Sequence, residues 1–93
     1  MSSNPRIEIY TTPFCPYCWR AKALLESRNL PFEEFDVARD RSLRKEMVER
    51  AGGRTTVPQI FIGNSHIGGC DDLYELEIAG KLDGVLEANG IEA

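Results

Sequence analysis

The sequence predicts an α/β domain in which helices flank a four-stranded mixed sheet. Apolar residues alternate at Ile7 and Ile9, as in a half-buried strand, and then recur at helical spacing in the next stretch. A strand–helix–strand start implies a parallel crossover, whereas residues 59–68 read as a hairpin with antiparallel strands. With 93 residues the chain can bury one core, so we expect a single domain over residues 1–93. The expected order is β-α-β-α-β-β-α, followed by a short final helix.

The first half of the chain carries clear start and stop signals for its elements. Pro16 suits the first position of a helix, because its missing N–H has no intrahelical partner there. Asn29 can adopt the left-handed conformation that ends a helix, and Asp40 is a suitable N-cap for the next one. We therefore expect a strand over residues 6–10, a helix from Pro16 to about Arg28, a strand over residues 32–37 and a helix from Asp40 to Gly52.

The second half begins with a predicted hairpin. Pro58 can precede a strand without removing a ladder hydrogen bond, and Gly63-Asn64 fits a tight turn with glycine first. Asp71 and Asp72 suit the positive N-terminus of a helix. The expected elements are strands over residues 59–62 and 65–68, a helix that opens at residues 69–72, and a short helix around residues 82–86 that Gly90 ends.

Composition and charge narrow the functional class. A net charge of -4 argues against nucleic-acid binding, which usually requires a basic surface. The apolar runs are too short to cross a bilayer, and residues 1–4 lack the pattern of a signal peptide. Three cysteines are an odd number, which fits poorly with a fully paired secreted framework. We therefore expect a monomer in the reducing cytoplasm, where a CxxC pair is catalytic or metal-binding rather than structural.

The CxxC pair, Cys15 and Cys18, lies where the first predicted helix begins. The free amides and the dipole of a helix N-terminus favour a thiolate, which is the form that attacks disulfides. Cys15 directly precedes the helix, so we expect it to be the more exposed thiol and the nucleophile. Cys18 lies one turn further in and is the expected resolving thiol, which displaces a mixed disulfide from Cys15.

A zinc site is the main alternative for the same two cysteines. Zinc takes about four ligands, and beyond the pair this chain offers only Cys70 and His66. A CxxC in a βαβ setting favours redox chemistry, so we predict no metal site. We interpret Trp19 and His66 as surface or partly buried residues without a role, and the basic residues between positions 39 and 54 as a solvated helix surface.

Three motifs together resemble the dithiol glutaredoxins, most closely the short bacterial type. They are Cys-Pro-Tyr-Cys at residues 15–18, Thr-Thr-Val-Pro at residues 55–58 and Gly-Gly-Cys-Asp-Asp at residues 68–72. The resemblance extends from Ile7 to about Leu86. It implies a thioredoxin-like fold, reduction of protein disulfides and protein–glutathione mixed disulfides, and glutathione as co-substrate without a tightly bound cofactor. Ribonucleotide reductase is one candidate client.

The resemblance also implies a glutathione site. Cys15 would take the glutathionyl group and Tyr17 would pack beside it. The family's cis peptide before Pro58 would turn the Val57 N–H and C=O outward, to pair with the glutathione backbone like an added strand. The amides of the turn at residues 69–71 would bind the γ-glutamyl carboxylate, and Asp71 its ammonium group. The implied set is Cys15, Tyr17, Thr56, Val57, Pro58, Gly69, Cys70 and Asp71.

One departure from the family and two other functions stay open. Many members carry a lysine a few residues before the first cysteine, but residues 11–14 hold no cation, so Arg44 and Arg54 are the candidate replacements. An iron–sulfur carrier would use the nucleophilic cysteine and glutathione, although Pro16 disfavours it because related cluster binders have a smaller residue there. A thioredoxin-type reductase recycled by a flavoprotein, or a non-catalytic binding module, is disfavoured by the γ-glutamyl-type turn at residues 68–72.

Overall fold

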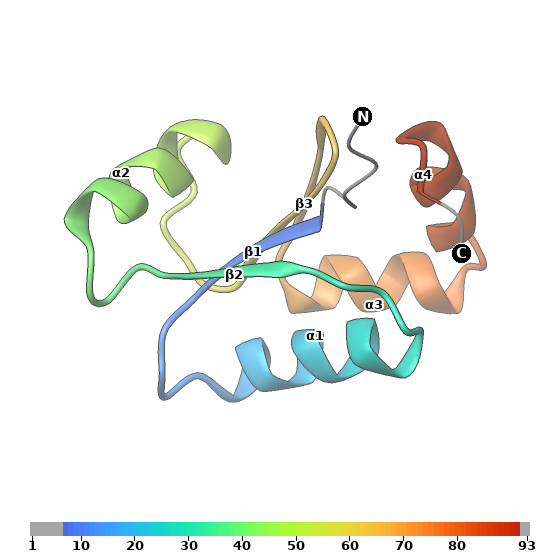
Figure 1. The fold of residues 1–93 in the computed structure, drawn as a ribbon, viewed down its shortest axis with the longest axis horizontal. Helices are drawn as coiled ribbons and strands as arrows, with labels where there is room; N and C mark the ends of the chain where they lie inside the picture. Colours follow the sequence, from blue (N-terminus) through green and yellow to red (C-terminus); the bar gives the residue numbers. More distant parts are fainter. Residues whose placement is uncertain (1–6, 92–93) are drawn as a thin grey trace.

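The computed structural model describes residues 7–91 and contains one mixed sheet with strand order β2-β1-β3-β4 (Figure 1). β1 pairs in parallel with β2 and antiparallel with β3, and β4 pairs antiparallel with β3. The predicted fold class and element order are therefore confirmed; the expected strand start at position 6 lies outside the described residues. The elements are β1 (Ile7–Thr11), α1 (Pro16–Ser27), β2 (Glu33–Asp36), α2 (Arg41–Arg50), β3 (Gln59–Ile62), β4 (Ser65–Gly68), α3 (Cys70–Ile78) and α4 (Leu82–Ala88).

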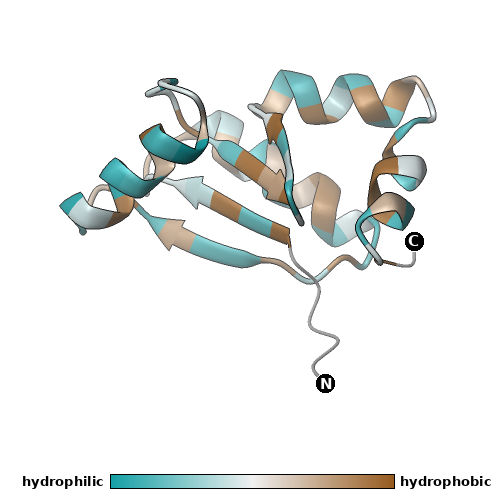
Figure 2. Ribbon diagram, turned by 90° about the horizontal axis from the view of Figure 1, so that it is seen from above, coloured by the Kyte–Doolittle hydropathy of each residue, from teal (hydrophilic) through white to brown (hydrophobic). Residues whose placement is uncertain are grey.

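The two faces of the sheet bury different cores. Ile7 and Ile9 of β1 pack with residues of α1, α3 and α4, whereas Tyr10 packs on the opposite face with Met47 of α2. Figure 1 shows the same layering, with α1 and α3 on one side of the sheet and α2 on the other. In Figure 2 the strands carry alternating hydrophobic and hydrophilic bands, while α2 is mostly hydrophilic. Alternation along the strands thus separates the two cores. No helix within residues 7–91 is long and apolar enough to cross a membrane.

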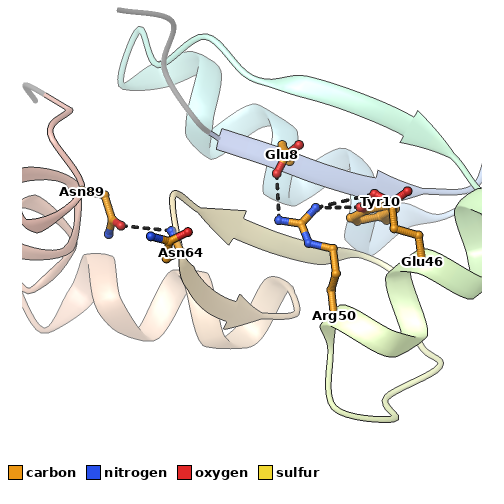
Figure 3. Close-up of polar contacts among 6 residues, drawn as sticks. All are labelled: Glu8, Tyr10, Glu46, Arg50, Asn64 and Asn89. Atoms are coloured by element: carbon orange, nitrogen blue, oxygen red, sulfur yellow. Dashed lines mark hydrogen bonds and ion pairs between the residues drawn. The ribbon is translucent and has the colours of Figure 1, made fainter.

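Local signals in the sequence begin and end the helices and the hairpin turn as predicted. Asp40 caps α2 by accepting the Ser42 N–H at 2.9 Å, and Asn29 has a left-handed φ of 56°. Gly63 has a φ of 59° in the β3–β4 turn, and a Cβ on it would overlap the side chain of Asn89. Asn89 Oδ1 in turn accepts the Asn64 N–H at 3.1 Å (Figure 3). The end of α4 therefore holds the hairpin turn, which requires glycine there.

Arg50 departs from the expected solvated helix surface. Its guanidinium donates to the Tyr10 hydroxyl at 2.7 Å and to Glu8 at 2.8 Å (Figure 3). The centre of the guanidinium also lies 4.1 Å from the centre of the Phe61 ring. The Tyr10 hydroxyl donates to Glu46 at 2.6 Å. Burial, followed by the hydrogen bond with Glu46, raises the pKa of Tyr10 to about 12. Arg50 therefore anchors α2 to β1 and β3.

Candidate active site

Sheet register brings the three sequence motifs to one end of the molecule. Tyr10, near the end of β1, pairs with Gln59 at the start of β3. Ile60 of β3 pairs in turn with Gly68, the last residue of β4. Because α1 follows β1 and α3 follows β4, the starts of both helices and the loop before β3 lie at this end of the sheet.

Cys15 is the N-cap of α1. Its backbone is extended, with φ -134° and ψ 100°, and its Sγ accepts the Cys18 N–H at 3.1 Å. The same Sγ lies 3.9 Å from the Val57 carbonyl oxygen. Cys15 is 8% exposed and Cys18 is fully buried, so the predicted order is correct, although Cys15 is more enclosed than its place before the helix indicated. Both cysteines are free thiols in this structure.

The environment of Cys18 keeps its thiol protonated at neutral pH. Burial raises its pKa most, and the hydrogen bond with Cys15 raises it further, against smaller lowering effects of the Thr12 backbone and Lys22. Lys22 is itself held 2.9 Å from Glu34. Cys18 therefore does not compete with Cys15 for an incoming disulfide, which suits a resolving thiol.

The loop before β3 presents an open backbone edge. The Val57–Pro58 peptide is cis, as predicted. Gln59 Nε2 donates to the Thr56 carbonyl at 3.1 Å and to its Oγ1 at 3.2 Å, which holds the loop on the sheet. Within residues 7–91 the Val57 N–H has no backbone hydrogen-bond partner. An extended ligand can therefore pair with Val57 as a strand pairs with a sheet edge.

The start of α3 lies across from this loop. The Gly69 N–H donates to Asp72 Oδ2 at 2.8 Å, so this amide is already occupied, contrary to the expectation that it binds a ligand. The Cys70 and Asp71 amides belong to the first turn and have no intrahelical acceptor. Cys70 is buried, and burial raises the pKa of its thiol. The amides at positions 70 and 71 are thus the ones available to an anion.

A cavity of about 320 Å³ lies between these segments. It contains every predicted glutathione-binding residue except Cys15, together with two charged residues that the predicted set lacks. From the sequence, Arg54 is one of two candidate cations, and Asp72 is expected only to complement the helix start. The cavity is lined by Tyr17, Arg54, Thr56, Val57, Pro58, Gly69, Cys70, Asp71 and Asp72.

Arg54 and Asp72 form an ion pair at the wall of this cavity, with Arg54 Nη1 3.5 Å from Asp72 Oδ2. A Cβ at Gly68, which has a φ of 113°, would overlap both side chains, so glycine gives them room against the backbone. Arg44 instead donates to the Thr55 carbonyl at 3.4 Å and does not line the cavity. Of the two candidate replacements for the missing lysine, Arg54 is therefore the one at the cavity.

A zinc site would need further ligands gathered around the two cysteines. Residues 7–91 contain no group of three or more His, Cys, Asp or Glu side chains arranged to hold a metal ion. His66 Nε2 lies 2.7 Å from Gln59 Oε1, and its ring stacks on Phe61 with centroids 4.8 Å apart. Its contacts therefore belong to the sheet face that α2 covers.

Known proteins resemble this chain in both sequence and fold. The glutaredoxin family model matches residues 7–67. The chain belongs to the glutaredoxin family. Glutaredoxin 3 of Escherichia coli (strain K12) is 56% identical over 81 residues, which are 87% of this chain and 96% of that protein. This glutaredoxin is accordingly a thiol–disulfide oxidoreductase with the Cys15–Cys18 pair in the position of the CxxC motif.

Two solved structures resemble this glutaredoxin over most of its length. The solution structure of glutaredoxin from Brucella melitensis has a TM-score of 0.76 and 56% identity, with 91% of each chain covered. The crystal structure of the buckwheat glutaredoxin–glutathione complex has a TM-score of 0.82 and 28% identity, and covers 96% of this chain and 83% of that chain. The thioredoxin-like fold expected from the sequence is therefore confirmed.

Proposed function

We propose that this glutaredoxin reduces protein disulfides and protein–glutathione mixed disulfides with glutathione as the electron donor. The observation that carries the proposal is the 320 Å³ cavity beside the Cys15 sulfur, which combines an open backbone edge, free helix amides and both signs of charge. Glutathione offers matching groups, because it is an extended peptide with two carboxylates and one ammonium group. The buckwheat glutaredoxin–glutathione complex, at 28% identity, supports the same ligand class.

Different residues of the cavity bind different groups of glutathione. The Val57 N–H and C=O pair with the cysteinyl backbone of glutathione and so hold its sulfur beside Cys15. The Cys70 and Asp71 amides bind the γ-glutamyl carboxylate. The Asp71 carboxylate binds the ammonium group, and Arg54 supplies the cation for the glycine carboxylate.

A mixed disulfide needs only the first cysteine. The Cys15 thiolate attacks the glutathionyl sulfur, a new S–S bond forms, and the client sulfur leaves as a thiolate that takes a proton from solvent. A free glutathione thiolate then attacks the glutathionyl sulfur on Cys15. This second exchange releases oxidised glutathione and restores the Cys15 thiolate.

A protein disulfide needs both cysteines. Cys15 attacks one client sulfur and frees the other as a thiolate, which leaves a Cys15–client mixed disulfide. Cys18 then attacks Cys15 and loses its proton as the second client sulfur departs and is protonated. The resulting Cys15–Cys18 disulfide is reduced by two glutathione molecules, which leave as oxidised glutathione.

One coupled assay tests the proposal. The protein should reduce the mixed disulfide of glutathione and 2-mercaptoethanol when glutathione and glutathione reductase supply electrons, and not when thioredoxin reductase replaces them. Cys15→Ser should abolish turnover, whereas Cys18→Ser should retain mixed-disulfide reduction and lose reduction of protein disulfides. Absence of turnover with glutathione would refute the proposal.

The remaining expectations are tested separately. A monomeric state and a cytoplasmic location stay predictions, as does ribonucleotide reductase as a client. Anaerobic purification tests the iron–sulfur alternative, since a carrier would show cluster absorbance.

A further inference from the structure

A fully buried polar side chain lies behind the proposed glutathione site. Gln59, the first residue of β3, is 0% exposed and directly follows the cis peptide. Its amide nitrogen Nε2 lies 3.1 Å from the Thr56 carbonyl oxygen and 3.2 Å from Thr56 Oγ1. Its amide oxygen Oε1 lies 2.7 Å from Nε2 of His66 in β4. Gln59 therefore links the imidazole ring on β4 to the loop that lines the cavity.

The Thr56 carbonyl determines which way each hydrogen bond runs. A carbonyl oxygen only accepts, so the NH₂ group of Gln59 must face it, and the opposite amide orientation would bring two acceptors together. Oε1 therefore faces His66 and needs a donor from it. Burial, followed by the nearby charge of Arg54, lowers the pKa of His66, so the ring is neutral at neutral pH and carries one N–H. That hydrogen must be on Nε2.

Strand pairing holds the imidazole ring beside Gln59. His66 pairs with Phe61 across β3 and β4, and the two rings stack with centroids 4.8 Å apart. Gln59 and Phe61 are two residues apart on β3, so their side chains point to the same face of the sheet. The sheet therefore fixes the donor before any ligand arrives.

The loop at the other end of this connection lies at the reacting sulfur. Thr56 and Val57 line the 320 Å³ cavity, and the Val57 carbonyl oxygen is 3.9 Å from Cys15 Sγ. Without a donor at position 66, Oε1 of Gln59 would be buried and unpaired, which is costly. The Gln59 amide would then turn or shift, and its two hydrogen bonds to Thr56 would weaken. The backbone edge offered to the ligand would lose its fixed position.

We propose that His66 is a positioning residue for glutathione binding: its Nε2–H orients the Gln59 amide, which in turn holds the loop before β3. The inference rests on the proposed glutathione-dependent function and adds to that site a residue on β4 that does not line the cavity. His66 touches neither the reacting atoms nor the cavity, so it acts through Gln59 alone.

The test replaces the donor and keeps the ring contact. His66→Phe can still stack on Phe61 but has no N–H, whereas the Nε2 of His66→Gln can replace the imidazole Nε2–H as donor. In the coupled assay at saturating glutathione, His66→Phe should raise the KM for the mixed disulfide of glutathione and 2-mercaptoethanol about 10-fold, which is about 1.4 kcal/mol. Its kcat should stay within about twofold, because the loop carries no reacting atom. His66→Gln should recover most of the KM.

Ser65→Ala is the matched control on the same strand. Asn89 Nδ2 donates to Ser65 Oγ at 3.2 Å, so this variant also removes one hydrogen bond made by a β4 side chain, but on the side of α4. Its KM should stay within about twofold of the wild type. The proposal is overturned by an unchanged KM in His66→Phe, by an equal rise in Ser65→Ala, by no recovery in His66→Gln, or by a fall in kcat at unchanged KM. A wild type that does not turn over with glutathione refutes the proposed function instead.

A second measurement needs no variant and therefore tests the proposal even if His66→Phe does not fold. His66 is the only histidine, so its ring nitrogens give unambiguous ¹⁵N resonances. At neutral pH the wild type should show Nε2 protonated and Nδ1 unprotonated. A ring protonated on Nδ1 alone could not donate to Gln59 and would overturn the proposal.

Discussion

Replacement of Arg54 by glutamine separates a binding role from a structural one. Its ion pair with Asp72 spans 3.5 Å, and the two side chains are 48% and 43% exposed. Such solvated pairs contribute only about 0.2–1 kcal/mol to folding. A charge-assisted hydrogen bond to a ligand carboxylate contributes about 1.5–3 kcal/mol. Arg54→Gln should therefore affect ligand binding more than stability.

The expected result is a KM for the glutathione mixed disulfide that rises about 10-fold to 100-fold, because each 1.4 kcal/mol is a factor of ten. Thermal unfolding should shift only slightly. Salt screens exposed charges, so high ionic strength should raise the KM of the wild type towards that of the variant. The coupled assay with glutathione reductase, run at low and high salt, measures the KM values, and thermal denaturation of the wild type and the variant measures the shift in unfolding.

Arg44→Gln is the matched control, since Arg44 contacts the same loop at the Thr55 carbonyl without lining the cavity. Its KM should stay within about twofold of the wild type, because an exposed contact outside the site contributes little to binding. The reasoning fails if Arg54→Gln leaves the KM unchanged, or if Arg44→Gln raises it equally. A large loss of folding stability in Arg54→Gln would also contradict it.

Three further predictions concern the scaffold. Arg50→Met should lower the free energy of unfolding by about 2 kcal/mol in urea titrations, because the change removes two hydrogen bonds and a ring contact. The folded state binds the Tyr10 proton more tightly than the unfolded state, with a pKa of about 12 against 10.0, so stability should fall as pH rises through this interval. Tyr10→Phe should make that fall shallower, and an unchanged slope would exclude Tyr10 as its source. Gly63→Ala should lose about 1–3 kcal/mol through its left-handed φ and the overlap with Asn89, and adding Asn89→Ala should recover part of the loss.

Signals that act within a few residues were sufficient to predict most of the fold. Proline at the start of α1, asparagine at its end, Asp40 before α2 and glycine in the hairpin each restrict the backbone locally. The order of strands and helices then limits the sheet to few arrangements. The element boundaries consequently agree to within one or two residues.

Contacts between distant elements could not be predicted in the same way. Arg50 lies on Phe61 because α2 crosses β3, and the sequence of α2 alone does not indicate which strand residue it will contact. Asp72 occupies the Gly69 amide and pairs with Arg54, which depends on how far each side chain reaches. The motifs identified the cavity through the resemblance, whereas its charge arrangement required three-dimensional positions.

The reacting atom of this enzyme is also the cap of its first helix, since Cys15 Sγ accepts the Cys18 amide hydrogen at 3.1 Å. Helix capping and redox chemistry are therefore thermodynamically linked. The free energy by which the helix start stabilises the reduced Cys15 sulfur is also the free energy by which that sulfur stabilises the folded chain. The difference in unfolding free energy between dithiol and disulfide forms must equal the difference in reduction potential between folded and unfolded chains, at about 1.4 kcal/mol per 30 mV. Measuring the free energy of unfolding of both redox forms thus shows how strongly folding favours the dithiol form over the disulfide form.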